Sequence, residues 1–230
     1  MVRGVLVAAL AVAALGFGGT AGAEVPAVGG TVTAADLAAA RQAAIGAEAQ
    51  VGAFLRHSTA SVGGDPVAVY ELSPEFVAGT SGTVGELGYV AVPARGADGS
   101  TASVWAVRDG RGWSVANIAT GDVEARQARR VPAGGVLLRE PQTGSWYAVV
   151  GGSVRPLAGG PAMSVADYQR QVQRRYGDKL PGSAYDRAGT AGGYGDVTAP
   201  APRGGGPVVV LGFLLGAAAL VGGAAALRRT

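Results

Sequence analysis

The chain has 230 residues but no cysteine and only one histidine, His57. Since thiolates and imidazoles are the usual ligands of zinc, the ordinary zinc sites cannot be built here, and a cysteine nucleophile is excluded. Without cysteine, an exported domain must also be stable without disulfides. We therefore expect no metal site.

Motifs of common enzymes are missing as well. The sequence contains no glycine-rich phosphate loop, no GxSxG nucleophile elbow and no HExxH. Lysine occurs once, at Lys179, and Tyr176 stands where an SxxK motif needs a serine. Because these motifs are absent, we expect no cofactor and no catalytic residue.

Two enzymatic alternatives rest on isolated residues. A Ser–His–Asp triad would have to combine His57 with a serine and Asp65, although a histidine in the last turn of a helix is more typical of a cap. Glu71 and Glu75 could form the carboxylate pair of a glycosidase, but they flank a strand end and a turn, where solvated side chains are common. A carboxylate-dependent hydrolase of cell-wall or surface polymers therefore stays as an alternative.

Positive and negative charges balance over most of the chain. The formal net charge is +3, from 19 basic and 16 acidic residues. Arg3, Arg228 and Arg229 lie near the two ends, and the other 16 basic residues balance the acidic ones. Because a nucleic-acid binder needs a concentrated positive surface, no nucleic-acid partner is expected. The 40 glycines and the preference for arginine over lysine are typical of a GC-rich bacterial genome, such as an actinobacterial one.

The N-terminal segment has the layout of a secretory signal peptide. Arg3 precedes an apolar run over residues 4–17, and the small residues Ala21-Gly22-Ala23 form a cleavage site before Glu24. An uncleaved N-terminal anchor is the alternative. We expect the following part of the chain to be exported.

A second apolar segment, residues 208–227, predicts a transmembrane helix. Its twenty residues carry no charged or hydrogen-bonding side chain, and as a helix they would span about 30 Å, the thickness of a bilayer core. Arg228 and Arg229 form a positive flank, which predicts a cytoplasmic tail. Gly212 and Gly216 form a GxxxG motif, so a homodimer through this helix is a further expectation.

The sequence therefore predicts five parts. They are a signal peptide (1–23), an extracytoplasmic domain (24–187), a disordered Gly/Pro/Ala-rich linker (188–207), the transmembrane helix (208–227) and a cytoplasmic tail (228–230). The linker is predicted to be disordered because it has too little apolar surface to offset its ordering entropy.

The fold class expected for the domain is α+β. Thr33 and Asp36 form a capping box, and apolar residues then recur at helical spacing as far as His57, which predicts one long N-terminal helix. Four segments alternate like strands of an antiparallel sheet: 67–72, 88–93, 101–108 and 113–119, with a hairpin at Asp109-Gly110. Over about residues 33–120, this order of helix and curved sheet resembles cystatin-like and nuclear-transport-factor-like folds, a resemblance that carries no functional residue.

A second small β group and a closing helix complete the prediction. The strands of this group are expected at residues 136–139, 146–150 and 154–157, after a short helix within residues 121–130. Ser164 and Asp167 fit a capping box that starts the closing helix, and Gly177 is expected to end it as a C′ residue.

Aromatic and arginine side chains supply the candidate binding residues. Trp113, Trp146 and Tyr147 lie on predicted strands and could line a recognition face. Arg170 and Arg174 lie one helical turn apart and could hold an anionic polymer or lipid headgroup. Half-buried aromatics are more often core residues, and arginines near acids are more often a solvated face.

The expected function is that of a single-pass, membrane-anchored extracytoplasmic protein of a bacterial envelope. It would be a non-enzymatic module that binds an envelope protein or polymer or has a structural role, with the lipid bilayer as its first partner. Besides the hydrolase, an accessory subunit of a membrane complex, using the transmembrane helix for contact, is a third hypothesis.

Overall fold

The computed structural model describes residues 27–57 and 59–187. The predicted signal peptide, the linker, the anchor with Gly212 and Gly216, and the C-terminal tail lie outside these residues. No helix within the described ranges is long and apolar enough to cross a membrane.

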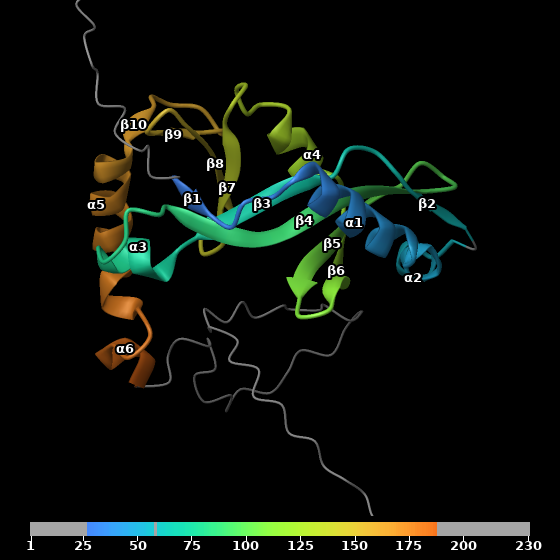
Figure 1. The fold of residues 1–230 in the computed structure, drawn as a ribbon, viewed down its shortest axis with the longest axis horizontal. Coiled ribbons are helices and arrows are strands. Elements are labelled where there is room, and N and C mark those ends of the chain that lie inside the picture. Colours follow the sequence, from blue (N-terminus) through green and yellow to red (C-terminus); the bar gives the residue numbers. More distant parts are fainter. Residues whose placement is uncertain (1–26, 58, 188–230) are drawn as a thin grey trace, which may run out of the picture.

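The α+β class is confirmed, and the described residues form one mixed sheet of ten strands at its centre (Figure 1). The sheet follows the order β10-β9-β8-β7-β3-β4-β5-β6, and β1 and β2 pair with β4 beside this path. The strands are β1 Val28–Gly29, β2 Ala60–Val62, β3 Val67–Leu72, β4 Gly85–Gly96, β5 Thr101–Asp109, β6 Gly112–Thr120, β7 Val136–Glu140, β8 Ser145–Val150, β9 Ser153–Pro156 and β10 Met163–Ser164. The helices are α1 Ala34–Ile45, α2 Glu48–Leu55, α3 Pro74–Ala78, α4 Val123–Ala128, α5 Val165–Tyr176 and α6 Ala184–Arg187, with a 3₁₀ turn at Gly177–Lys179.

The second β group is not separate from the main sheet, contrary to the prediction. Strand β7 pairs in parallel with β3, with Val69 opposite Leu137, and β8 and β9 continue from β7 as antiparallel neighbours. Because β4 occupies only one edge of β3, the other edge remains for β7. The sheet is therefore mixed, and β1 adds a second parallel pairing at β4.

Strand β4 has twelve residues and connects the two halves of the domain. Its residues alternate between the faces of the sheet, as a period of two requires: Val90 and Val92 contribute to one cluster, Tyr89 and Ala91 to another. The predicted hairpin between β5 and β6 is confirmed, with Asp109 opposite Gly112.

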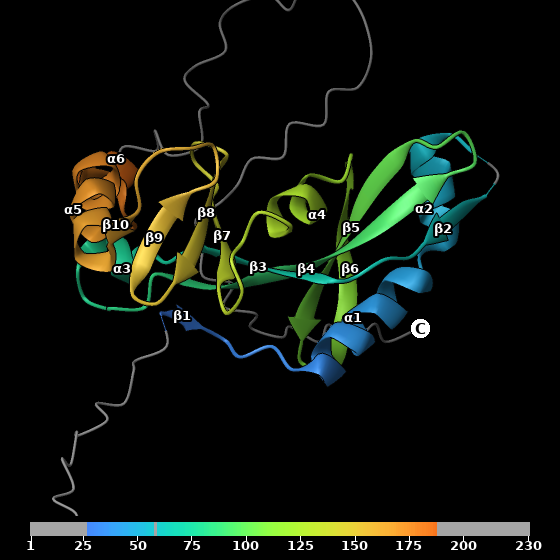
Figure 2. The ribbon, with the colours of Figure 1, turned by 90° about the horizontal axis from the view of Figure 1, so that it is seen from above.

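The first face of the sheet is covered at both ends by helices (Figure 2). At one end, α1 and α2 place Ala40, Ala44 and Val51 on strands β4 and β5. At the other end, α3 and α5 bury Phe76 and Tyr168, whose rings stack with centroids 6.1 Å apart. The second face carries a smaller cluster beneath α4, built around Val69, Tyr89, Ala91, Leu137, Ala148 and Leu157.

The prediction of a single long N-terminal helix is wrong. The capping box of Thr33 and Asp36 does start α1, but α1 ends at Ile45 and α2 begins at Glu48. Gly46 caps the first helix, and Ala47 leaves the helical conformation. Glycine has a low helix propensity, and the break allows α2 to contact β2. His57 consequently follows a left-handed Arg56 and does not lie in the last turn of a helix.

The predicted closing helix is confirmed as α5. The Ser164 hydroxyl accepts a hydrogen bond from the Asp167 backbone N–H at 3.0 Å, as a helix cap requires. Gly177 does not take the expected left-handed conformation: its φ is −61°, and the chain continues into the 3₁₀ turn.

A buried carboxylate, Glu140, connects this helix to the sheet. The Glu140 side chain at the end of β7 is fully buried and accepts hydrogen bonds from the hydroxyls of Tyr147 at 2.9 Å and Tyr168 at 3.1 Å. Arg175 and the hydroxyl of Tyr176 bind the other carboxylate oxygen. Burial and the Glu140 carboxylate raise the pKa of both Tyr147 and Tyr168, so these hydroxyls stay protonated and donate.

Replacing Glu140 by glutamine should be strongly destabilising. A buried charge that loses its partner costs roughly 3–5 kcal/mol, and because the Arg175 side chain is 33% exposed we expect the lower end, about 3 kcal/mol. Tyr147→Phe removes one hydrogen bond to a charged group and should cost about 1.5 kcal/mol. Free energies of unfolding from denaturant titration measure both. If Glu140→Gln costs no more than Tyr147→Phe, the cluster does not hold α5 on the sheet.

Candidate functional site

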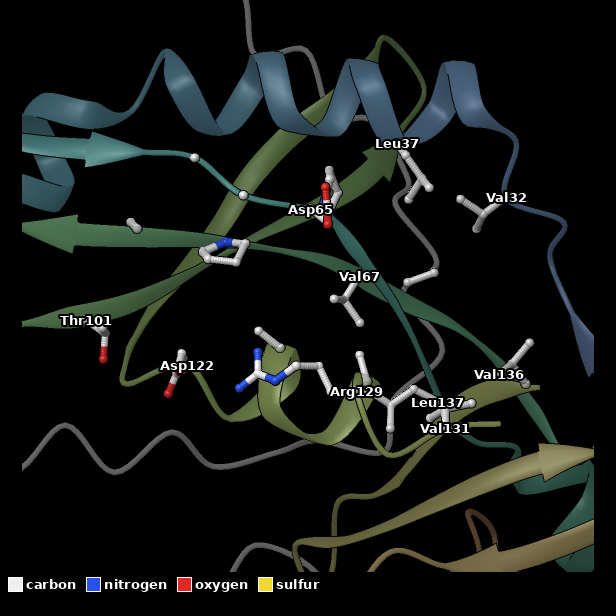
Figure 3. A pocket seen from close by; sticks show the side chains of 18 of the residues that line it. Val32, Leu37, Asp65, Val67, Thr101, Asp122, Arg129, Val131, Val136 and Leu137 are labelled. Atoms are coloured by element: carbon white, nitrogen blue, oxygen red, sulfur yellow. The ribbon is translucent and has the colours of Figure 1, made fainter. Parts of the chain in front are cut away.

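A pocket with a volume of about 930 Å³ lies beside β4, at the connection from β2 to β3 and the start of β7 (Figure 3). One wall comes from the N-terminal part of α1 and from the connection over residues 63–66. The opposite wall comes from α4, the loop over residues 131–135 and the start of β7. Elements distant in sequence therefore form the site.

The walls are mainly apolar. Leu37, Val67, Val131 and Leu137 line the pocket, together with the small side chains of α4. Backbone hydrogen bonds hold the loop over residues 131–135 in place. Val131 donates its N–H to the carbonyl of Ala128, and Gly135 donates its N–H to that of Pro132. These bonds position the apolar side chains independently of a ligand.

The connection between β2 and β3 depends on a glycine. Gly63 donates its backbone N–H to the carbonyl of Pro93 at 3.0 Å, which holds the chain against β4. Gly64 then has a φ of +103°, a conformation that side-chain-bearing residues rarely adopt. The wall formed by residues 63–66 therefore needs a glycine at position 64.

The charged groups of the pocket differ in whether they have partners. Asp122 forms an ion pair with Arg126, and Arg95 donates to the carbonyl of Gly99 at 3.4 Å. Arg129 caps the C-terminal end of α4, and its side chain extends into the pocket in Figure 3. No described residue pairs with the Arg129 guanidinium, nor with the carboxylate of Asp65 on the opposite wall.

The second face of the sheet carries an arginine between two tryptophans. The Arg139 guanidinium lies 5.4 Å from the ring centroid of Trp105 and 5.8 Å from that of Trp146, and it pairs with Glu71 at 3.3 Å. Tyr89 stacks on Trp105 with centroids 4.2 Å apart. Since Arg139 and Tyr89 both lie on its ring, Trp105 contributes to packing more than to ligand contact.

The two glutamates of the hydrolase hypothesis have separate partners. Burial raises the pKa of Glu71, and Arg139 opposes this shift. Gly88 makes room for Glu71, because a Cβ at this position would come within 2.8 Å of the Glu71 Cγ. The Glu75 carboxylate accepts a hydrogen bond from the hydroxyl of Ser73, which caps α3, at 2.8 Å.

The five predicted binding residues do not form a common surface. Trp113 packs on the α1 side of the sheet beneath Arg108, and Trp146 belongs to the second face. Tyr147 is buried and binds Glu140. On α5, Arg170 pairs with Asp167, and Arg174 is exposed.

None of these five residues lines the pocket, so sequence reasoning missed the site. Arg126, Arg129 and Arg130 were visible as a cluster at helical spacing, but the sequence does not show which of them faces a cavity.

His57 meets a different acid from the one predicted. Its Nε2 lies 3.0 Å from Asp98 Oδ1, in the turn between β4 and β5, whereas Asp65 lies at the pocket. The same Asp98 oxygen accepts the backbone N–H of Ser100 at 2.9 Å. The side chain and backbone of Ser100, and then His57, hold the pKa of Asp98 at about 2. This contact connects the end of α2 to the turn.

Comparisons of the chain with protein-family models, with curated proteins and with solved structures find no match.

The Asp98 contacts predict a pH-dependent contribution to stability. Because folding lowers the Asp98 pKa from 3.8 to about 2, the contribution is present above about pH 4 and is lost as the pH falls through 2. Asp98→Asn should therefore destabilise the protein at neutral pH, and its difference from wild type should shrink in acid. Denaturant titration over this pH range measures it, with Asp65→Asn as the control. A difference that is constant with pH would contradict the prediction.

Proposed function

We propose that the chain is a non-enzymatic binding module of a bacterial envelope that takes a small, largely apolar molecule into the pocket described above. The observation that carries this proposal is the pocket itself. Its volume of about 930 Å³ falls within the range of roughly 300–1,000 Å³ that is typical of ligand sites. Apolar walls with a few polar groups are the usual lining of such sites, because the walls supply affinity and the polar groups fix orientation.

The same proposal includes location. The signal-peptide layout and the apolar segment of residues 208–227 favour a domain held on the outer side of the membrane. A pocket of this kind would then be available to molecules of the envelope.

Protease treatment of intact cells tests this location. Residues 24–206 should be degraded while a cytoplasmic marker protein stays intact, because only chain outside the membrane is accessible. Permeabilised cells serve as the control for protease activity. Protection of residues 24–206 in intact cells would overturn the proposed topology.

A hydrolase remains the second candidate because burial raises the Glu71 pKa, as a general acid requires. The pairing of Glu71 with Arg139, and of Glu75 with Ser73, favours the binding module, since both carboxylates already have structural partners. The two functions differ under Glu71→Gln and Glu75→Gln, which should leave ligand binding intact but abolish hydrolysis.

Filling the pocket should block binding without unfolding the domain. Ala125 on α4 lines the pocket, whereas Ala133 is exposed on the adjacent loop and is not part of the lining. We expect Ala125→Trp to abolish labelling by the methyl ester of a photoreactive fatty acid, and Ala133→Trp to retain it. The measurement uses the full chain in lipid nanodiscs, with labelled peptides over residues 63–68 and 131–137 identified by mass spectrometry. Equal labelling of both variants would reject the pocket as the binding site.

A further inference from the structure

The partners of the charged groups indicate what the pocket selects. Of the two arginines in its lining, Arg95 donates to the Gly99 carbonyl, and Arg129 has no partner within the described ranges. Of the two aspartates, Asp122 is neutralised by Arg126. Asp65 is exposed on the opposite wall, beside the connection from β2 to β3. Because Asp122 is paired with Arg126, which lies outside the lining, two cations, Arg95 and Arg129, stand against one unpaired anion, Asp65. The unpaired cation, Arg129, lies at the C-terminal end of α4.

Arg129 lies next to apolar side chains that can receive a hydrocarbon body. Val131 follows two residues later in the chain, and Leu137 and Val67 lie on the adjacent strands (Figure 3). A guanidinium group binds a carboxylate with two parallel, charge-assisted hydrogen bonds. Arg129 is exposed, so a carboxylate that enters the pocket from solvent can reach it. The position of Arg129 at the end of α4 thus offers one anion site at the edge of an apolar surface.

We propose that the ligand is a single-chain amphiphile with one carboxylate, bound as a free molecule with its head group on Arg129 and its hydrocarbon chain along Val67, Val131 and Leu137. This inference rests on the proposed function, because it specifies the ligand of the same pocket. A single chain fits better than a two-chain phospholipid. Pockets of the size seen here, about 930 Å³, typically take drug-sized ligands, and a two-chain phospholipid is larger than these.

The test compares an acid with its neutral ester. Full-length protein in lipid nanodiscs is labelled with a photoreactive fatty acid or with its methyl ester, and labelled pocket peptides are quantified. Arg129→Gln should reduce labelling by the acid about tenfold, the loss expected for a charge-assisted hydrogen bond, and leave labelling by the ester unchanged. Arg130→Gln is the matched control, because Arg130 is exposed, adjacent and not in the lining.

Two further arms separate the alternatives. Asp65→Asn should raise labelling by the acid, since it removes a like charge; a decrease would show that the Asp65 carboxylate supports binding of the acid and would overturn the inference. Labelling should be the same in phosphatidylcholine nanodiscs and in nanodiscs that contain phosphatidylglycerol. Displacement of the acid by phosphatidylglycerol would show that the site takes bilayer lipid, which also overturns it.

The outcomes distinguish this inference from the proposed function. Suppose that both probes label the Arg129→Gln variant as strongly as the wild-type protein, while Ala125→Trp blocks labelling by both. The pocket then binds ligands, but Arg129 does not select the acid. If neither probe labels the pocket in the wild-type protein, the proposed function fails together with the inference.

Discussion

The buried carboxylate of Glu140 is the interaction on which the second half of the domain depends. Its hydrogen-bond partners come from β8 and from three positions on α5, so one side chain connects the sheet to its covering helix. Because a buried carboxylate is costly without such partners, the arrangement is either complete or strongly unfavourable. The position of α5 in turn fixes α3, since Gln169 donates to the backbone carbonyls of Phe76 and Ser81 at 3.0 Å.

Strand β7 connects the Glu140 cluster to the pocket, because it contributes residues to both. Its residues alternate between the faces: Leu138 and Glu140 point toward α5, whereas Leu137 and Arg139 belong to the second face. The parallel pairing of β7 with β3 sets the position of Leu137 opposite Val69. The loop before β7, which begins at Val131, supplies the lower wall of the pocket. The wall of the pocket formed by this loop and the start of β7 therefore depends on the core on the first face of the sheet.

The parts of the fold that sequence reasoning predicted are those that depend on neighbouring residues. The capping residues Thr33 and Ser164, the β5–β6 hairpin and the segments of β3 and β5 follow from local patterns. The parallel pairing of β3 and β7 joins segments that are about seventy residues apart, and no local pattern specifies it. The break at Gly46 was missed because apolar spacing continues across it into α2.

The site could not be predicted for a related reason. A side chain can bind a ligand only if the fold leaves it without a partner, and the residue type does not show this. Trp113 was predicted as a recognition residue, but it packs on the α1 side of the sheet with Arg108 over its ring. Arg126 on α4 and Arg129 at its C-terminal cap lie three residues apart, yet Arg126 pairs with Asp122 one turn before it, while Arg129 extends into the pocket. Since residues three apart lie on nearly the same face of a helix, the difference arises from the partner that Asp122 gives to Arg126 and from the walls that the rest of the fold places opposite Arg129.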